Sequence, residues 1–438
     1  MDTTTGAVLS SFSSADAPLG VVMVPCGNRR EHICPACSRT YAADTFQLIR
    51  AGVAGGKTVP ASVGAHPLVF ATLTAPSFGH VHSGRYGGTC RPATRGPARC
   101  PHGRSTTCHR THDDGDDLAG QPICPDCYDY AGHVLWHYHA PELWRRFTIA
   151  LRRALARRCS VSESRLSDVA TVQYAKVAEY QARGAVHFHA LIRLDGPKTS
   201  DGYADPPAWL TADDLADLIR TAASSVSVTA PAPVDGHPAR VLRFGRQLDA
   251  RPVRMKRAHL EDGALSAEQV AGYLAKYATK SAGDPTTDTH HTRRLRRVCA
   301  EYADAARARE SAGTAMPGKD GHDVYLRMGN WIHMLGFRGH FASKSRRYSI
   351  TLGRLRRARR RYARLVADAA RTGQPLDVAD LETRLLAEDD AETTLVVGSW
   401  TYAGTGWPNL GDEALALAAA ARAREYDRWR AAQHRPSA

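Results

Sequence analysis

The sequence contains no long hydrophobic run and no leader-like start. No apolar stretch approaches the roughly 20 residues that a membrane-spanning helix needs. Residues 1–20 contain neither a basic start nor a hydrophobic segment, which argues against a secretory signal peptide. We therefore expect a cytoplasmic protein with no membrane partner, in which residues 1–23 form a disordered leader.

Acidic side chains are too few to balance the basic ones. The 438 residues include 58 Lys and Arg but only 44 Asp and Glu, which gives a formal net charge of +14. This surplus favours polyanionic partners, nucleic acid first, although an arginine-rich proteome would produce the same total. The clustering of the basic residues favours nucleic acid, because they gather at 240–257, at 293–297 and from Lys344 through Arg364.

Cysteine is scarce beyond residue 127, where only Cys159 and Cys299 occur, and we expect both to be ordinary buried thiols. The other eight of the ten cysteines lie earlier. In a cytoplasmic chain, the two Cys-Pro-x-Cys pairs indicate bound metal rather than disulfides. The sequence thus predicts one or two structural zinc sites, with ligands drawn from Cys26, Cys34, Cys37, Cys90, Cys100, Cys108, Cys124 and Cys127. Their grouping stays open, and His102 is either a substitute ligand or a plain loop histidine.

A stretch from Arg183 to Ile192 alternates residues of two kinds. Val186, Phe188, Ala190 and Ile192 interleave with His187, His189 and Leu191, a period of two that is typical of a β-strand with unlike faces. Both imidazoles then project from one side, where they could hold one ion or one phosphate. An isolated His-x-His is more often a pair of surface or core histidines, so its interpretation depends on the neighbouring motifs.

A second chemical motif lies in a predicted helix over residues 266–280. Tyr273 and Tyr277 are four residues apart and share one face, and Lys276 and Lys280 share a neighbouring face. A nearby ammonium group makes a tyrosine hydroxyl a better nucleophile, and a metal held by histidines would polarise a phosphate under attack. These parts suit a phosphodiester transesterase with a phosphotyrosine intermediate. The alternative is an amphipathic helix with two half-buried aromatic residues.

Apolar spacing and turn residues predict the other elements. We expect further helices over Asp44–Ala51, Pro141–Arg158, residues 211–223 with Thr211 as N-cap, residues 292–310 and Asp412–Arg430. We expect strands over Leu68–Thr74, Val169–Tyr180, the His-x-His stretch, Arg240–Arg254 and Arg338–Thr351. The strand Arg240–Arg254 would present one basic face, and we expect DNA contacts from Arg243, Arg246, Arg254, Lys256 and Arg257.

Three motifs in this order resemble those of HUH endonucleases, and more narrowly the two-tyrosine initiators of rolling-circle replication. They are Phe70-Ala-Thr-Leu-Thr74, Arg183-Gly-x-x-His187-Phe-His189, and Tyr273-x-x-Lys-Tyr277-x-x-Lys280. The stretches 124–130, 143–147, 244–248 and 339–349 are similar to replication initiators of actinobacterial integrative and conjugative plasmids. The resemblance covers roughly residues 24 to 425.

The resemblance implies an α+β fold whose central antiparallel sheet forms an HUH endonuclease core, with packed helices and a zinc-binding module. It also implies a catalytic Mg²⁺ or Mn²⁺ ion on His187, His189 and a third ligand. Glu179 is our choice for the third ligand, and Gln181 on the same strand face is the alternative. We expect a cysteine-rich segment at 24–64, the core at 65–285 with a cysteine-rich insertion at about 80–130, and a mostly helical basic region at 286–438.

The function implied by the resemblance is site-specific nicking and rejoining of a single DNA strand, which starts and ends rolling-circle replication of a plasmid. Tyr277 would attack first and Tyr273 second, and the partners would be single-stranded and duplex origin DNA, with a host helicase as a further candidate. The alternatives are a two-tyrosine HUH transposase and a zinc-ribbon DNA-binding regulator without catalysis. Conjugative relaxases fit less well, because their tyrosine usually precedes the histidines.

Overall fold

The structure is a computed structural model that describes residues 5–8, 11–31, 33–83, 89–90, 98–112, 116–199, 203–253, 272, 274, 288–318, 320–387 and 397–433. The chain forms two compact units, one of residues 49–349 and one of residues 1–48 with 350–438. No helix of the described residues is long and apolar enough to cross a membrane. The four-part division expected from the sequence stays a prediction.

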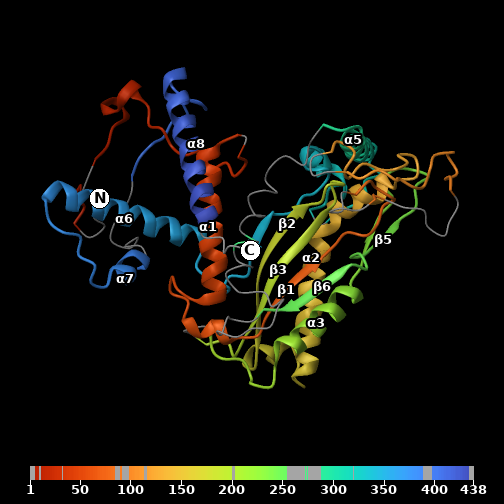
Figure 1. Cartoon of the computed structure of the whole chain (residues 1–438), viewed down its shortest axis with the longest axis horizontal. Coiled ribbons are helices and arrows are strands. Elements are labelled where there is room, and N and C mark those ends of the chain that lie inside the picture. The colour runs from red at the N-terminus through yellow and green to blue at the C-terminus, as the bar shows by residue number, and fades with distance from the viewer. Residues whose placement is uncertain are drawn as a thin grey trace. The chain divides into compact units, whose positions relative to one another are not determined.

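The unit of residues 49–349 is built on a five-stranded sheet in the order β6-β1-β3-β2-β7 (Figure 1). Each adjacent pair is antiparallel, so the central antiparallel sheet expected from the sequence is confirmed. The strands are β1 (Leu68–Leu73), β2 (Thr171–Tyr180), β3 (Val186–Asp195), β6 (Leu248–Pro252) and β7 (Ala342–Lys344).

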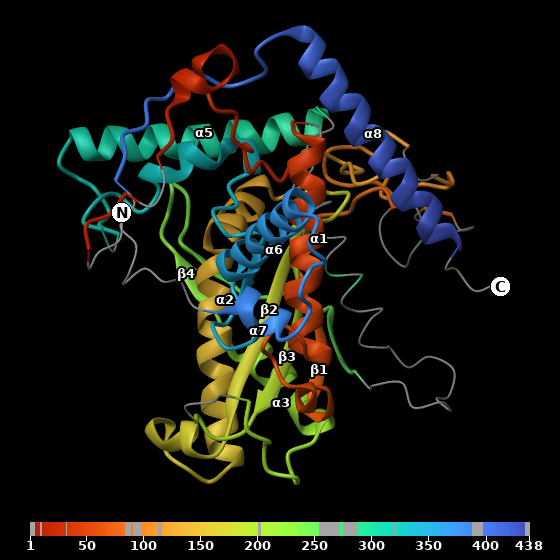
Figure 2. The same ribbon diagram turned by 90° about the vertical axis from the view of Figure 1, so that its left-hand side faces the viewer.

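Two helices pack against this sheet and form the main core with it. Helix α2 (Tyr130–Arg158) runs along the sheet, and α3 (Ala212–Ser225) lies beside α2, β1 and β6 (Figures 1 and 2). Phe188 of β3 is fully buried against Trp136 and Trp144 of α2. Because side chains alternate along a strand, His187 and His189 lie on the opposite face of the sheet.

The rest of this unit closes around α2. Helix α5 (His290–Ser311) packs on α2 and on a 3₁₀ segment, Leu326–Met334, and the short strands β4 (Val228–Ala230) and β5 (Arg240–Leu242) form a separate two-stranded sheet. The predicted helix over 292–310 is therefore present, two residues longer at its start and one at its end.

The other unit is helical. It contains most of α1 (Pro35–Ala54), together with α6 (Leu352–Thr372), α7 (Leu381–Leu386) and α8 (Leu410–Gln433). Its fully buried carboxylate, Asp44, accepts hydrogen bonds from the guanidinium groups of Arg356 and Arg359. Arg356 and Arg359 of α6 therefore have a structural partner within this unit.

Two predicted strands were wrong in extent. The stretch Arg240–Arg254 is divided between β5 and β6, which belong to different sheets. The break centres on Gly245, whose N–H donates to the Thr74 carbonyl at 2.8 Å, and a Cβ there would come within 2.6 Å of the Ala75 oxygen. The stretch Arg338–Thr351 contains only the three residues of β7.

Two predicted helices begin earlier than expected. Helix α1 starts at Pro35, nine residues before Asp44, and α2 starts at Tyr130 and continues through Pro141. The Asp129 side chain caps α2 by accepting a hydrogen bond from Gly132 N. The predicted helix over 266–280 lies outside the described residues except for Gly272 and Leu274, which are both helical.

Candidate metal centres and the adjoining cleft

Glu179, His187 and His189 converge on the face of the sheet that is opposite α2. The β2–β3 register places Glu179 directly across from His187. The Glu179 Oε2 atom lies 2.9 Å from His187 Nε2 and 3.0 Å from His189 Nε2. Gln181, the alternative third ligand, instead lies beside the other ring nitrogen, with its Nε2 atom 3.5 Å from His187 Nδ1. The arrangement therefore favours Glu179 as the third ligand.

Strand β1 orients the second histidine. Thr72 pairs with His189 across the sheet, and its Oγ1 atom lies 3.0 Å from His189 Nδ1. The ring of Phe70 stacks on the same imidazole, with 5.6 Å between ring centroids. These contacts hold His189 so that its Nε2 atom faces Glu179. Residues of the motif Phe70–Thr74 thus orient a histidine of the motif Arg183–His189.

The protonation states at this cluster suit a divalent cation. Burial alone would raise the pKa of Glu179, but its hydrogen bonds with His187 and His189 outweigh burial and lower the pKa. Burial lowers the pKa of His189, partly offset by Glu179. Both directions favour a charged carboxylate on Glu179 and a neutral imidazole on His189. A set of one carboxylate and two imidazoles fits Mg²⁺ or Mn²⁺, because oxygen suits hard ions and imidazole extends the fit to transition metals.

A buried histidine network supports the turn between β2 and β3. His137 Nε2 accepts from the Val186 N–H at 2.9 Å, and its Nδ1 lies 2.8 Å from the Leu335 carbonyl oxygen. His291 Nε2 lies 3.0 Å from the Arg183 carbonyl oxygen. These histidines were not predicted from the sequence. The available signal was His133-Val-Leu-Trp-His137, two histidines on one face of a helix.

The eight cysteines predicted to bind zinc fall into three groups of close donor atoms, two of which include histidines. Within each group the donor atoms all lie within 4.8 Å of one another, and the groups are Cys26, Cys34 and Cys37; Cys100, His102, Cys124 and Cys127; and His82, Cys90, Cys108 and His112. His102 lies with the cysteines, its Nδ1 atom 3.2 Å from Cys127 Sγ. His82 and His112 were missed, because their spacing matches no paired-cysteine motif. Cys299 is buried and Cys159 half-buried, and neither joins a group among the described residues.

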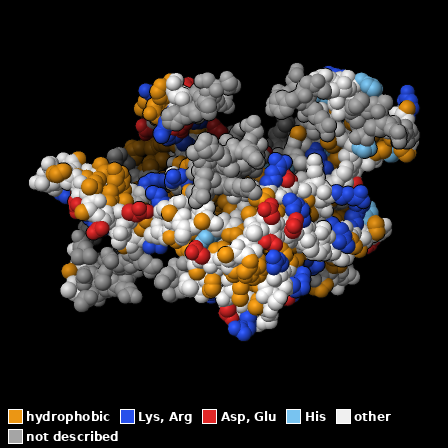
Figure 3. All heavy atoms as spheres, turned by 60° about the horizontal axis from the view of Figure 1, so that its bottom comes forward, with side chains coloured by type: hydrophobic (Ala, Val, Ile, Leu, Met, Phe, Trp, Pro, Cys, Tyr) orange, Lys and Arg blue, Asp and Glu red, His pale blue; other side chains and the backbone are white. Residues whose placement is uncertain are grey.

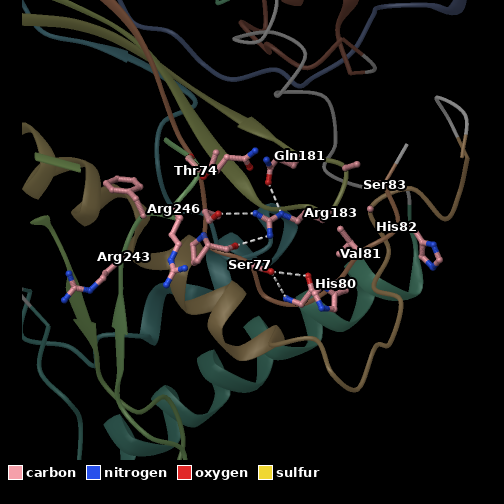
Figure 4. A pocket seen from close by; sticks show the side chains of 18 residues that line it. Thr74, Ser77, His80, Val81, His82, Ser83, Gln181, Arg183, Arg243 and Arg246 are labelled. Carbon is pink, nitrogen blue, oxygen red and sulfur yellow. Dashed lines mark hydrogen bonds between the residues drawn. The ribbon is translucent and has the colours of Figure 1, made fainter. Parts of the chain in front are cut away.

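An open cleft of about 920 Å³ lies at the end of β1. Figure 4 shows Arg183 at its centre, with Arg243 and Arg246 on one side and His80 and His82 on the other. The Arg183 guanidinium donates to the carbonyls of Ala75 and Pro76 at 3.2 and 3.0 Å.

Two of the five predicted DNA contacts, Arg243 and Arg246, line this cleft and are exposed. The other three predicted DNA contacts, the two tyrosines and the two lysines lie outside the described residues: Arg254, Lys256, Arg257, Tyr273, Tyr277, Lys276 and Lys280. On the face drawn in Figure 3, Lys and Arg side chains are scattered among hydrophobic and uncharged ones rather than gathered in one block.

The chain is similar to known proteins over most of its length. The family model RepSA, described as "Replication initiator protein, pSAM2", matches residues 1–421. A curated replication initiator protein from Streptomyces ambofaciens is 45% identical over 427 residues, which cover 92% of this chain and 81% of that protein. No solved structure matches the chain.

Proposed function

This chain belongs to the RepSA family of replication initiator proteins, and from that membership we propose that it nicks and rejoins one strand of a plasmid origin to start and end rolling-circle replication. The observation that carries the proposal is the convergence of Glu179, His187 and His189 on one point. Two imidazoles and a carboxylate at that spacing could hold a divalent ion of the kind that phosphodiester chemistry uses.

The proposed chemistry is a reversible transesterification at tyrosine. The Tyr277 hydroxyl loses its proton and attacks the scissile phosphorus, the bond from phosphorus to the 3′ oxygen breaks, and that oxygen takes up a proton to become the 3′-hydroxyl primer. The 5′-phosphate stays on Tyr277, so the bond energy is kept for rejoining. Tyr273 would attack in the same way when the fork returns. Lys276 and Lys280 would favour the ionised tyrosine.

A bound Mg²⁺ or Mn²⁺ on Glu179, His187 and His189 would supply positive charge to the phosphate oxygens. The protein's own part is to fix that position: Thr72 holds His189, and the β2–β3 register sets Glu179 opposite His187. Arg243 and Arg246, on the rim of the adjoining cleft, would neutralise backbone phosphates of the bound strand.

Cleavage of a supercoiled plasmid that carries the origin tests this function. With Mn²⁺, the wild-type protein should convert supercoiled DNA to the nicked form at one mapped site and remain attached to the 5′ end. Tyr277→Phe should lose the covalent adduct and most of the nicking, because it lacks the attacking oxygen. His187→Ala and His189→Ala should lose metal-supported cleavage but still fold, because the apolar face of β3 is unchanged.

Each alternative function gives a different result. Nicking by Tyr277→Phe at the wild-type rate, together with its loss in Tyr273→Phe, would exchange the roles of the two tyrosines. Cleavage only at the ends of a mobile element would identify a transposase. Specific binding without cleavage at any Mn²⁺ concentration would identify a DNA-binding regulator and refute the proposed function.

A further inference from the structure

The segment of residues 74–129 between β1 and α2, here called the excursion, contains four residues that are spaced like the ligands of one metal ion. His82 Nδ1 lies 3.2 Å from His112 Nε2, Cys108 Sγ lies 3.4 Å from the same nitrogen, and Cys90 Sγ lies 3.8 Å from His82 Nδ1. Tetrahedral zinc, with bonds of about 2.3 Å to sulfur and about 2.0 Å to nitrogen, requires donor–donor separations of roughly 3.3 to 3.8 Å. These three separations, 3.2 to 3.8 Å, match that range closely, and all four donor atoms lie within 4.8 Å of one another.

The surroundings of these donors also fit a metal. His112 Nδ1 lies 2.7 Å from Asp116 Oδ2, a contact that turns Nε2 toward Cys108 and His82. Metal-bound histidines commonly have such a carboxylate partner on the other ring nitrogen. The Ser83 N–H donates to Cys90 Sγ at 3.3 Å, a contact that fixes the position of this sulfur. The donors that the described residues bring together here are two thiols and two imidazoles, a set that selects zinc over magnesium.

The same residues shape the cleft. His82 and Ser83 line it, and His82 is held in a short antiparallel pairing in which its N–H donates to Gln121 and its carbonyl accepts from Gly120, both at 2.8 Å. Gly120 lies so close to the turn between β2 and β3 that an added Cβ would overlap the Ala182 carbonyl. This pairing therefore links the four-residue group to the turn that joins the strands of Glu179 and His187.

We propose that His82, Cys90, Cys108 and His112 bind a zinc ion that holds one wall of this cleft, separate from the ion that Cys100, His102, Cys124 and Cys127 would bind. The zinc site stands on the geometry alone. Its role as a wall for DNA rests on the proposed function. Figure 4 shows His82 across Arg183 from Arg246, so the wall and the basic rim lie on opposite sides of the cleft.

Zinc counting on the full chain tests the site. The protein is purified without chelator and its zinc per chain is measured by elemental analysis for wild type, His112→Asn, His112→Cys and His109→Asn. His109 is an exposed neighbour in the same loop and outside the group, so it is the matched control. We expect His112→Asn to contain one zinc fewer than wild type, and His112→Cys and His109→Asn to keep the wild-type number, because a thiolate can replace the imidazole.

A second readout does not depend on a variant that loses metal. With cobalt in place of zinc, His112→Cys should shift the visible absorption bands relative to wild type, because a nitrogen donor becomes sulfur, and His109→Asn should leave them unchanged. Equal zinc in His112→Asn and wild type, or an unshifted cobalt spectrum in His112→Cys, would overturn the site. The site would also be overturned if the protein purified without chelator contained no zinc and instead had a disulfide between Cys90 and Cys108.

The cleft role is tested separately, by binding of a single-stranded origin oligonucleotide. His112→Asn should bind it at least several-fold more weakly than His109→Asn at equal salt. Loss of one zinc with unchanged DNA binding would refute the role of this site as a wall of the DNA cleft, but not the zinc site itself. Failure of the wild type to nick DNA would refute the proposed function but not the zinc count.

Discussion

The contact between Thr72 and His189 orients one ligand of the candidate catalytic metal ion. The Thr72 hydroxyl is the partner of His189 Nδ1, and partners of this kind typically change metal affinity by about 10- to 100-fold. We expect Thr72→Val to raise the Mn²⁺ concentration for half-maximal nicking by about that factor, while nicking at saturating Mn²⁺ stays within a few-fold of wild type.

Thr171→Val is the matched control, because Thr171 starts β2 and its Oγ1 atom contacts the Gly196 carbonyl, at the opposite end of the strand from Glu179. The control should keep the wild-type Mn²⁺ dependence. If Thr72→Val keeps it as well, the hydroxyl does not orient the ligand.

Several buried histidines make the folded protein sensitive to acid. Burial lowers the pKa of His137 to about 3 and those of His139 and His291 to about 4. An unfolded chain binds these protons near pH 6.5, so the stability held above pH 6.5 is lost as the pH falls towards 4. Each such histidine should contribute roughly 1 kcal/mol per pH unit over that range.

His139 offers a clean test of this linkage. Its side chain packs against Tyr138 and Tyr325, and within the described part of the chain its Nε2 atom has no hydrogen-bond partner. We expect His139→Phe to unfold at a similar urea concentration to wild type at pH 7 and at a higher one at pH 5. Identical pH dependence in both proteins would show that His139 is protonated equally in the folded and unfolded states.

The sequence pointed to Glu179, His187 and His189, which the structure brings together, but not to all of their surroundings. His187 and His189 follow from strand alternation, and Glu179 from the resemblance to HUH endonucleases. The ligand role of His82 and His112 could not be predicted, because it depends on how a loop folds back on itself. His137 and His291 were missed for a related reason, since their partners are backbone groups far away in the sequence.

At the scale of elements, the contact between the excursion and the β2–β3 turn depends on one glycine. Gly120 has φ +84°, in the left-handed region, and an added Cβ would overlap the Ala182 backbone. Gly103 has a similar φ of +73° but open space around it. Both alanine variants incur the cost of the left-handed backbone, about 1 kcal/mol, but only Gly120→Ala must also displace the turn.

We therefore expect Gly120→Ala to lower the unfolding midpoint in urea by clearly more than Gly103→Ala does. It should also reduce Mn²⁺-dependent nicking, because the displaced turn joins the strands of Glu179 and His187. Equal effects of the two substitutions would mean that the excursion does not rest on the turn in solution.

The elements that the sequence predicted well carry their own local signals. Helix α3 starts at Ala212, directly after the expected N-cap Thr211, which forms a capping box with Asp214. The prediction of one strand over Arg240–Arg254 was wrong because the break at Gly245 results from contact with residues 74 and 75, which are far away in the sequence. The resemblance to plasmid replication initiators was confirmed at the level of the family.

For the whole molecule, the basic rim of the cleft should account for part of the salt dependence of DNA binding. Each phosphate contact to a single strand contributes about 0.7 to the slope of log K against log salt. We expect Arg243→Ala with Arg246→Ala to flatten that slope by roughly 1.4 for an origin oligonucleotide. Arg360→Ala with Arg364→Ala removes the same charge from exposed positions of α6 and should change the slope less. Equal slopes for the two double variants would place the DNA elsewhere.

We expect the pairing of β1 with β3 also to limit how quickly the chain reaches its folded state. Leu73 of β1 pairs with Phe188 of β3, so the chain must close a loop that contains the whole excursion and α2 before these two strands can pair. Closing such a loop costs entropy that grows with the logarithm of its length, and halving the effective length should speed closure about threefold. Ions that gather the cysteine-rich excursion early would shorten the search in this way. Refolding from urea with zinc present should then be faster than with a chelator, and equal rates would show that metal acts only after the strands have met.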